Sequence, residues 1–460
     1  MEYVDIAYEA WKGSARFRAD RTRLKRFTYG DQWGDFVPAP GGALISEREM
    51  AARSGATPHT NNLLRQMVKT AVGLYRRDYA VAVPETLREV AERNSLDELD
   101  ARSLEEFLIS GCAVQRVVSE RRPEGAGLWV DIVSPERFFV NAYRDPRGCD
   151  IDTIGMLHDM RPTVAMIRFG GKDPARRTRV WQECTAGEAR MPAALFPDDR
   201  SCFNEAPQGM CRVIELWTME VSRAVKGYDP AARRPFMCSE DQLTVIDEAN
   251  RLRADTMKIA YRCVDTARWK CRWLTPGGFL LSEYYSPFAH RSHPFAVKMY
   301  PLIDGEVHSL VEDVVDQQKY INRMISLIDK IMQSSAKGVL LFPDDRKPDN
   351  YSWDDVADLW CDCRGIIPFK SVPGSTVMPQ QITTTGATAD AHRLLGTQLE
   401  LMEQISGVAG GLIGKGLPAN ASAALYETRA RYSATALTDI FGAFSSFIGN
   451  RNRLLLTANR

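Results

Sequence analysis

Apolar residues recur every three or four positions between Asp304 and Lys337, a spacing that predicts one long helix. Its apolar face comprises Val307, Leu310, Val311, Val314, Ile321, Met324, Ile325, Ile328, Ile331 and Met332. Charged and amide side chains, among them Gln318 and Asn322, are expected on the opposite face, and Asp304 is expected to cap the first turn. At about 1.5 Å per residue the helix would be about 45 Å long, so it needs partners along its length.

The chain after this helix predicts two more helices and two connecting segments. A compact segment over 338–389 contains a strand at 339–342, a short acidic helix at 353–360 and many turn residues. A helix follows over 390–405, with Leu394, Leu395, Leu399, Met402 and Ile405 facing inward. After a glycine-rich break, a third helix runs from about 421 to the end of the chain. Its apolar stripe is Leu425, Leu437, Ile440, Phe441, Phe444, Phe447 and Ile448.

The chain before the long helix divides into a helical part and a strand-rich part. Helices are expected near the N-terminus, over 61–75 and over 95–111. A basic stretch at 16–26 is expected to be a solvated helix face, because acidic residues interrupt it. From 113 to 299, short runs rich in Val, Ile and aromatics predict a mainly antiparallel sheet with helical insertions; TRVWQE at 178–183 is one of these runs. The fold class is therefore α+β.

The composition is that of a folded protein without a global charge bias. The 460 residues are 44% hydrophobic and 26% charged, and their formal net charge is zero, which argues against a basic nucleic-acid coat. No apolar run is long enough to cross a membrane, and the N-terminus does not resemble a signal peptide, so we expect the protein to stay in the cytoplasm where it is made. The ten cysteines lack zinc-site spacing and are expected to be reduced thiols.

None of the candidate catalytic motifs has the residues that its chemistry requires. The sequence around Gly414 and Lys415 resembles a phosphate-binding loop, but Ala409 stands where the first glycine is needed and Gly416 where Ser or Thr must hold Mg²⁺. The adjacent acids at 344–345 and 354–355 are explained by turns and helix starts rather than by a metal site. The scattered histidines are expected to be ordinary surface residues. The sequence therefore predicts no enzyme, no metal and no cofactor.

Several ordered motifs together resemble the portal proteins of tailed double-stranded DNA bacteriophages. Tyr29-Gly30-Asp31-Gln32-Trp33 followed by Asn61-Asn62 resembles the family's opening pattern. Ser134-Pro135-Glu136-Arg137-Phe138-Phe139 with Asp145-Pro146 resembles its strand-and-turn signature, and residues 313–326 resemble its stem helix. No single motif is specific, but their order spans essentially the whole chain.

The resemblance implies a portal-type fold with five parts. They are a mixed α/β wing (1–300), antiparallel stem helices (304–337 and 390–405), a small α/β clip (338–389), a glycine-rich tunnel loop (406–421) and a long C-terminal helix (422–460) that returns to the wing. The crown that follows this helix in family members is expected to be minimal or absent, unless the chain is truncated.

The resemblance also implies partners and a place in the virion. We expect a homo-oligomeric ring, commonly of twelve subunits, at one capsid vertex, with assembly in the host cytoplasm. Its partners would be double-stranded DNA, the terminase large subunit, a head–tail adaptor, and the major capsid and scaffolding proteins, without a membrane.

Two sets of residues are candidate sites under this resemblance. The tunnel loop would present Gly410, Gly411, Leu412, Ile413, Gly414, Lys415 and Gly416 to DNA. The clip would present Asp344, Asp345, Arg346, Lys347, Asp349, Tyr351, Trp353, Asp354 and Asp355 to packaging and tail partners. Another neck or connector ring protein, or a DNA-processing enzyme, would be the alternatives.

Overall fold

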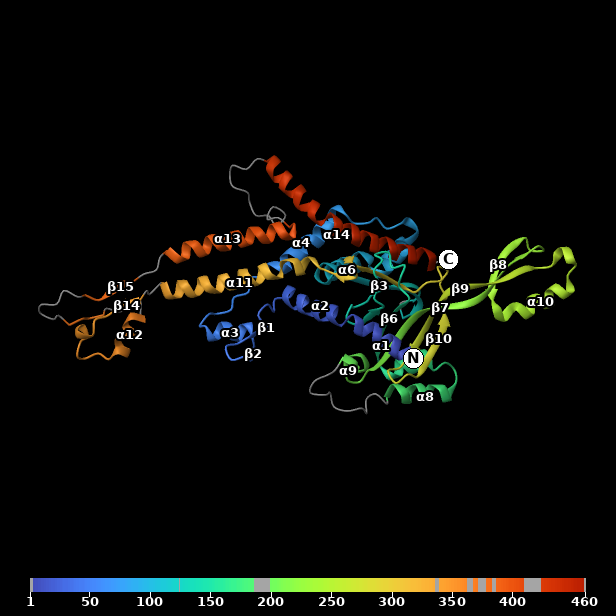
Figure 1. Ribbon diagram of the computed structural model, residues 1–460, viewed down its shortest axis with the longest axis horizontal. Coiled ribbons are helices and arrows are strands. Elements are labelled where there is room, and N and C mark those ends of the chain that lie inside the picture. The colour runs from blue at the N-terminus through green and yellow to red at the C-terminus, as the bar shows by residue number, and fades with distance from the viewer. Residues whose placement is uncertain are drawn as a thin grey trace. The chain divides into compact units, whose positions relative to one another are not determined.

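The computed structural model has an α+β fold that divides into two compact units (Figure 1). It describes residues 3–123, 125–185, 199–335, 339–361, 367–370, 378–382, 386–408 and 423–458. Unit 1 comprises 1–21, 76–308 and 440–460, and unit 2 comprises 22–75 and 309–439. Residues 22–75 thus group with the long helix and not with the rest of the expected wing segment.

The centre of unit 1 is an antiparallel sheet in the order β10-β9-β7-β6-β5, with β8 also paired to β7. Its strands are β5 (Phe138–Val140), β6 (Thr153–Met160), β7 (Cys211–Asp229), β8 (Arg234–Ser239), β9 (Ala260–Leu274) and β10 (Leu280–Tyr285). A three-stranded antiparallel sheet contains β3 (Cys112–Arg122), β4 (Gly125–Ile132) and β11 (Phe295–Met299), with β3 in the middle. The strand-rich region predicted over 113–299 is confirmed.

Unit 1 also contains helices. They are α1 (Tyr3–Gly13), α5 (Arg88–Asn94), α6 (Leu96–Ser110), α7 (Pro162–Phe169), α8 (Pro174–Thr185), α9 (Asp199–Asn204) and α10 (Leu243–Leu252), with 3-10 turns η1 (Glu85–Leu87), η2 (Glu240–Gln242) and η3 (Asp255–Met257). Of these helices, α1, α5, α6 and α8 contact the sheets. The strand predicted over 178–183 is wrong, because this run lies inside α8. Val180 and Cys184, four residues apart, are the buried positions of α8, so the relevant period is helical.

Unit 2 is mainly helical. It contains hairpin strands β1 (Phe36–Pro38) and β2 (Leu44–Ser46), α3 (Glu47–Arg53), α11 (Leu310–Ser335), β14 (Val339–Leu341), η4 (Asp344–Arg346), α12 (Trp353–Cys361), β15 (Gln380–Ile382) and α13 (Gly386–Ser406). The helices α2 (Ala15–Thr28), α4 (Leu63–Asp78) and α14 (Ala423–Ala458) have residues in both units. The predicted strand at 339–342 and the acidic helix at 353–360 are both confirmed within about one residue.

The long helix begins six residues later than predicted. Asp304 and Gly305 both have positive φ (54° and 87°) and form the turn between β12 (Pro301–Ile303) and β13 (Glu306–Val307). Asp304 therefore does not cap the helix. Ser309 does, because its hydroxyl accepts a hydrogen bond from the Glu312 N–H at 3.0 Å and the Glu312 carboxylate accepts the Ser309 N–H at 3.4 Å.

The C-terminal half of α14 packs into unit 1 through its predicted apolar stripe. Phe441, Phe444 and Phe447 are fully buried, and the Phe444 ring lies 5.6 Å from that of Phe107 on α6. Near the end of α14, Arg451 makes a two-bond ion pair with Asp100 at 2.9 and 3.0 Å. The small residue Gly442, between Phe441 and Phe444, is exposed.

Candidate functional site

The helix α11 is the element that organises unit 2, and it lies beside α13. The two helices contact each other, run in opposite directions, and have their β14–β15 ends level (Figure 1). A small subdomain of β14, η4, α12 and β15 lies between them in sequence. The pair and the subdomain correspond in sequence to the segments expected as stem and clip.

A polar stripe on α11 is buried, contrary to the prediction that its amide side chains lie away from the packed face. Gln318, Asn322 and Ser326 are 0, 1 and 2% exposed. They are spaced four residues apart and therefore lie on one face of the helix, one turn after another. Buried amides require hydrogen-bonding partners.

The partner of this stripe is the backbone of the segment before α4. The N–H groups of three alternate residues donate to successive side chains of α11: His59 to Ser326 Oγ (2.9 Å), Asn61 to Asn322 Oδ1 (3.1 Å) and Leu63 to Gln318 Oε1 (3.1 Å). Four helical residues rise about 6 Å, close to the span of two extended residues, so the two repeats match. We call this set of contacts the amide ladder.

The resemblance motifs meet at the amide ladder. Gln32 is 2% exposed; its amide donates to Asn62 Oδ1 at 3.2 Å, and its oxygen accepts from Asn322 Nδ2 at 2.6 Å. Asn62 in turn donates to the Thr28 carbonyl at 2.9 Å. The motifs at 29–33, 61–62 and 313–326 are thus parts of one polar core. This core links residues more than 250 positions apart, and local periodicity does not reveal the link.

An ion cluster fastens the β1–β2 hairpin and α3 to α11. Lys319 Nζ lies 2.6 Å from Asp35 and 2.8 Å from Glu47, and Arg23 Nε donates to Asp35 at 3.0 Å. Burial alone would raise the pKa of Asp35, but the bonds from Lys319 and Arg23 outweigh it and hold the pKa below its ordinary value. Arg26 also contacts Asp35.

Part of the basic stretch at 16–26 is used for internal contacts, which corrects the expectation of a solvated face for Arg18 and Arg21, whereas Arg16, Arg23 and Lys25 are exposed. Arg18 is 8% exposed and stacks over Trp11 with 3.5 Å to the ring centroid. Arg21 is 4% exposed and pairs with Glu106 at 2.6 Å. Because these arginines already have anionic or aromatic partners, they do not form a free basic patch.

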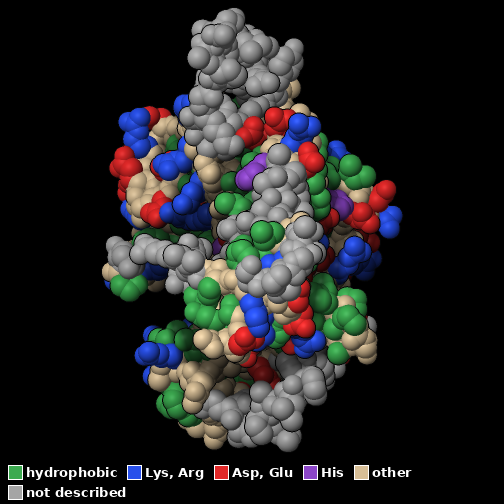
Figure 2. Space-filling model, turned by 90° about the vertical axis from the view of Figure 1, so that its left-hand side faces the viewer, with side chains coloured by type: hydrophobic (Ala, Val, Ile, Leu, Met, Phe, Trp, Pro, Cys, Tyr) green, Lys and Arg blue, Asp and Glu red, His purple; other side chains and the backbone are tan. Residues whose placement is uncertain are grey.

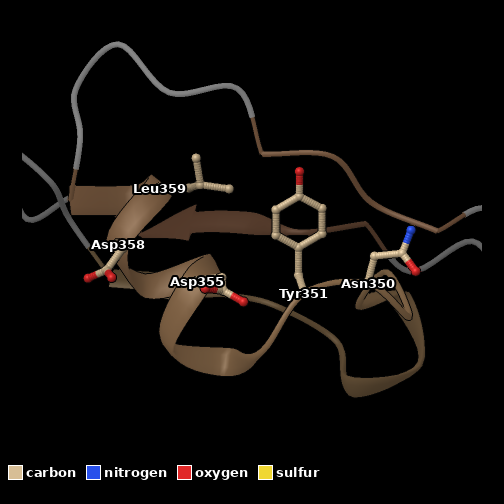
Figure 3. A pocket seen from close by; sticks show the side chains of 5 residues that line it. All are labelled: Asn350, Tyr351, Asp355, Asp358 and Leu359. Atoms are coloured by element: carbon tan, nitrogen blue, oxygen red, sulfur yellow. The ribbon is translucent and has the colours of Figure 1, made fainter.

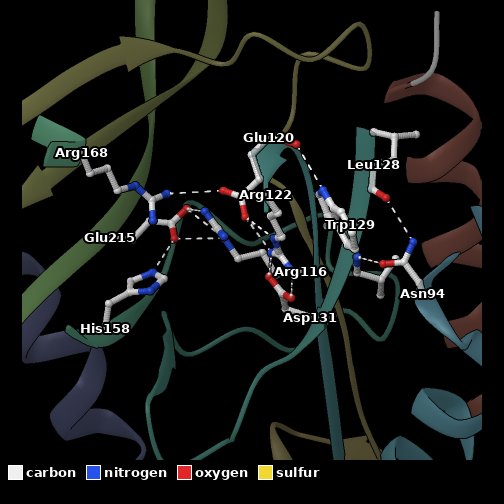
Figure 4. A network of polar contacts seen from close by, with 11 residues as sticks. Asn94, Arg116, Glu120, Arg122, Leu128, Trp129, Asp131, His158, Arg168 and Glu215 are labelled. Carbon is white, nitrogen blue, oxygen red and sulfur yellow. Dashed lines mark hydrogen bonds and ion pairs between the residues drawn. The ribbon is translucent and has the colours of Figure 1, made fainter. Parts of the chain in front are cut away.

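A buried charge network joins the six-stranded and three-stranded sheets of unit 1 (Figure 4). Arg116 on β3 pairs with the fully buried Glu215 on β7 at 3.1 Å, and His158 Nε2 on β6 lies 2.8 Å from the same carboxylate. Burial would raise the pKa of Glu215, but Arg116 and hydrogen bonds from His158 and Trp217 lower it to about 2. Burial lowers the pKa of His158, so a neutral imidazole is expected at neutral pH.

Two histidines, His158 and His293, differ from the surface residues predicted, whereas His308 and His392 are exposed as predicted. His158 packs against Trp273 as well as Glu215, and His293 lies 4.8 Å from Trp269 between ring centroids. Burial and the neighbouring His290 lower the pKa of His293 to about 3. These contacts are structural.

The predicted partner-binding residues of the clip fall into two groups. Arg346 is only 3% exposed and donates to the Lys370 carbonyl at 3.4 Å, so its prediction as a surface residue is wrong. Asp355 forms a capping box with Ser352 at the start of α12, and these hydrogen bonds lower its pKa. The remaining predicted residues are half-buried or exposed: Asp344, Asp345, Lys347, Asp349, Tyr351, Trp353 and Asp354.

An open pocket on the subdomain is lined by Asn350, Tyr351, Asp355, Asp358 and Leu359 (Figure 3). The Tyr351 ring stands beside the start of α12, and the two carboxylates project from that helix in the same view. The Trp353 indole is 45% exposed, with Phe342 edge-on at 6.1 Å. This surface combines aromatic and acidic groups without catalytic geometry.

The predicted tunnel-loop residues 410–416 lie outside the described residues. The last described part before them is the end of α13, where Gly407 adopts a positive φ of 65° and Val408 N–H donates to Ser406 Oγ at 3.1 Å. Cys361 ends α12, and Cys363 also lies outside the described residues.

Within the part of the chain that the structure describes, no three His, Cys, Asp or Glu side chains are grouped so that they could hold a metal ion. No described helix combines the length and the apolar character needed to cross a bilayer. The cysteines with described surroundings are free thiols.

Paired long helices thus bracket a small subdomain, and the chain also contains a strand-rich unit. Residues 1–458 match the model of the Phage P22-like portal protein family, and the chain belongs to this family. The family is structural, and membership implies a virion component that forms an oligomeric ring with capsid and DNA. No curated protein matches the chain.

Proposed function

We propose that this chain forms the ring at one capsid vertex through which phage DNA is packaged and ejected. The observation that carries the proposal is the antiparallel α11–α13 pair, which brackets a small subdomain and is fixed at α11 by the amide ladder. A channel wall must stay rigid while DNA moves past it, and buried, fully hydrogen-bonded polar contacts favour such rigidity.

The parts of the chain take the following roles in this proposal. The helices α11 and α13 are the stem, residues 338–389 the clip, and residues 406–421 the tunnel loop, with Lys415 facing DNA. The sheets of unit 1 belong to the wing, which contacts the major capsid and scaffolding proteins, and α14 returns the chain to it. Twelve subunits would close the ring.

The charge of the protein suits a conduit for DNA. Each firm contact of Lys or Arg with a phosphate adds salt-dependent affinity and would slow sliding. The chain has no net charge, and the face drawn in Figure 2 shows acidic and basic side chains interspersed among its described residues. Weak, non-specific contact with DNA is therefore expected.

The clip is proposed to dock the terminase large subunit during packaging and a head–tail adaptor afterwards. Exposed Trp353 supplies the kind of aromatic anchor common in protein interfaces, and the neighbouring carboxylates Asp354 and Asp358 favour a basic partner surface.

Negative-stain electron microscopy of the purified protein, together with its solution mass, tests the ring. Rings with a central hole of about 20 Å or more would support a channel for duplex DNA. If assembly in the host cytoplasm depends on scaffolding protein, rings should form when that protein is co-expressed, even where the isolated chain is monomeric. A compact monomer under both conditions would refute the proposal. Nuclease or nucleotide hydrolysis by that monomer would favour a DNA-processing enzyme, whereas rings unable to support packaging would favour another neck protein.

A further inference from the structure

Both helices of the α11–α13 pair carry a second apolar strip that is partly exposed in the described subunit. On α11 it consists of Tyr320 and Leu327, which are 39 and 46% exposed, followed by partly buried Ile331. On α13 it consists of Leu394, Leu401 and Ile405, which are 39, 38 and 43% exposed. Both strips have the spacing i, i+7, i+11, which is the repeat of an apolar seam between packed helices.

This arrangement corrects the expectation that Leu394 and Ile405 face inward. Met402, in contrast, is buried at 5% as expected. The helix α13 therefore has two apolar sides, one toward its own subunit and one toward solvent. A helix that is apolar on more than one side is typical of an element with more than one packing partner.

Two positions of each strip match in height along the helix pair. The helices are level at the end where α11 finishes at Ser335 and α13 starts at Gly386 (Figure 1). Leu327 and Leu394 both lie eight residues from that end, and Tyr320 and Leu401 both lie fifteen residues from it. Because both helices rise by the same distance per residue, each pair lies at one level.

One pair of oppositely charged residues flanks the strips at similar levels. Arg323 lies twelve residues from the common end and Glu400 fourteen. Arg323 is 54% exposed although it also contacts Glu47 at 3.2 Å. Opposite charges at the same level favour one alignment of the strips over others.

We propose that the α11 strip of one subunit packs against the α13 strip of the next subunit, with Leu327 opposite Leu394 and Tyr320 opposite Leu401. The inference rests on the proposed ring. Each subunit of a cyclic ring presents two different faces to its two neighbours, and two dissimilar strips with two positions at matching heights meet this requirement. A ring axis that runs along these helices keeps residues of neighbouring subunits at equal height.

Disulfide trapping between differently substituted chains tests this pairing. Leu327→Cys and Leu394→Cys are introduced into separate chains, which are co-assembled and oxidised with copper phenanthroline. We expect a covalent dimer in the mixture, with the peptides containing positions 327 and 394 linked by mass spectrometry. The unsubstituted chain measures the background from native thiols such as Cys149, Cys202 and Cys263.

A matched control uses Leu327→Cys with Ile405→Cys. These positions differ by eleven residues in height, about 16 Å along the helix, which is too far for a disulfide. Rings that give no 327–394 dimer above background, or that give the 327–405 dimer equally well, would overturn the inference while leaving the ring intact. Absence of rings in every preparation would instead refute the proposed function and, with it, the inference.

A second measurement tests the strip by weakening assembly. Leu327→Asp should raise the concentration needed for ring formation about tenfold or more, because it places an unpaired charge at the centre of the contact. Leu252→Asp on α10, whose leucine is 90% exposed, is the control and should assemble normally. Equal assembly of both variants, each with an unchanged circular dichroism spectrum, would count against the α11 strip as an interface.

Discussion

Replacing Asn322 by leucine should release the segment before α4 from α11. The Asn322 carbonyl accepts the N–H of Asn61 at 3.1 Å and Gln318 Nε2 at 3.0 Å, and its Nδ2 donates to Gln32 Oε1 at 2.6 Å. Leucine has a similar size but no polar atom. The substitution therefore removes the middle of the amide ladder without opening a large cavity.

The magnitude follows from the groups left unpaired. Gln318 Nε2 retains the Asn61 carbonyl as an acceptor at 2.6 Å, so its loss is partial. The Asn61 N–H and Gln32 Oε1 lose the contacts that Asn322 makes, at about 1–3 kcal/mol for each unsatisfied buried group. A loss of about 3 kcal/mol in local stability corresponds to a change of about 100-fold in the opening equilibrium.

Hydrogen exchange followed by mass spectrometry measures this opening directly. In the unsubstituted protein the amides of His59, Asn61 and Leu63 should be protected, although residues 59–62 have no regular secondary structure and Leu63 only begins α4. Asn322→Leu should accelerate exchange in the peptide covering 59–63 by about 100-fold.

The control is Asp316→Leu, which changes an exposed residue of the same helix. It should leave exchange at 59–63 within a few-fold of the unsubstituted protein. If Asn322→Leu produces no greater acceleration than this control, the ladder does not hold the segment, and the energetic reasoning is wrong.

Three further predictions concern unit 1. In a urea titration, Gly111→Ala should destabilise it by about 2–4 kcal/mol, because φ is +73° and a Cβ atom would lie 2.7 Å from a valine methyl. The control Gly442→Ala lies in an open helical position and should be neutral or stabilising in the same titration. His293 has a pKa of about 3, below its unfolded value, so its stabilising contribution is complete above about pH 6.5 and is lost as the pH falls toward 3. Protonation of His293 should contribute about 2 kcal/mol to the loss of stability between pH 6.5 and 5. His293→Gln should flatten this dependence of the unfolding free energy on pH, whereas exposed His392→Gln should not. An unchanged slope in both variants would contradict the lowered pKa of His293. Glu215→Gln leaves a buried arginine without its anion and should lower the unfolding free energy by about 3–5 kcal/mol at pH 7, so a loss below 1 kcal/mol would show that the charge is compensated elsewhere.

The order of helices and the strand-rich region could be predicted because apolar periodicity records burial directly. The start of α11 could not, since the apolar pattern continues through Val307 into the preceding hairpin. The Asp304-Gly305 pair was the available signal, because Asp-Gly is typical of a two-residue hairpin turn. At these residues the apolar periodicity predicts a helix and the Asp-Gly pair predicts a turn, and the structure has the turn.

The helix α8 shows the opposite difficulty. Val180 and Trp181 favour a strand by composition, yet Pro174 occupies the first position of a helix whose buried residues are Val180 and Cys184. Composition over six residues was less informative than the position of a proline and a four-residue period.

The sequence pattern does not predict the amide ladder, because polar side chains on a helix ordinarily face solvent. Gln318 and Asn322 are buried because backbone N–H groups from a distant segment satisfy them, and a pattern in either segment alone does not reveal the match. The family motifs contained this information implicitly, since Gln32 and Asn61 belong to them.

The basic stretch bears on how the protein would handle DNA. Counted as a sequence, residues 16–26 offer a row of cations, but Arg18, Arg21 and Arg23 are already engaged by Trp11, Glu106 and Asp35. An arginine held by a carboxylate releases few counterions from DNA, because binding a phosphate would require breaking the existing pair. The stretch at 16–26 should therefore add less to the salt dependence of DNA binding than its six Lys and Arg residues would allow, as the proposed channel for sliding DNA requires.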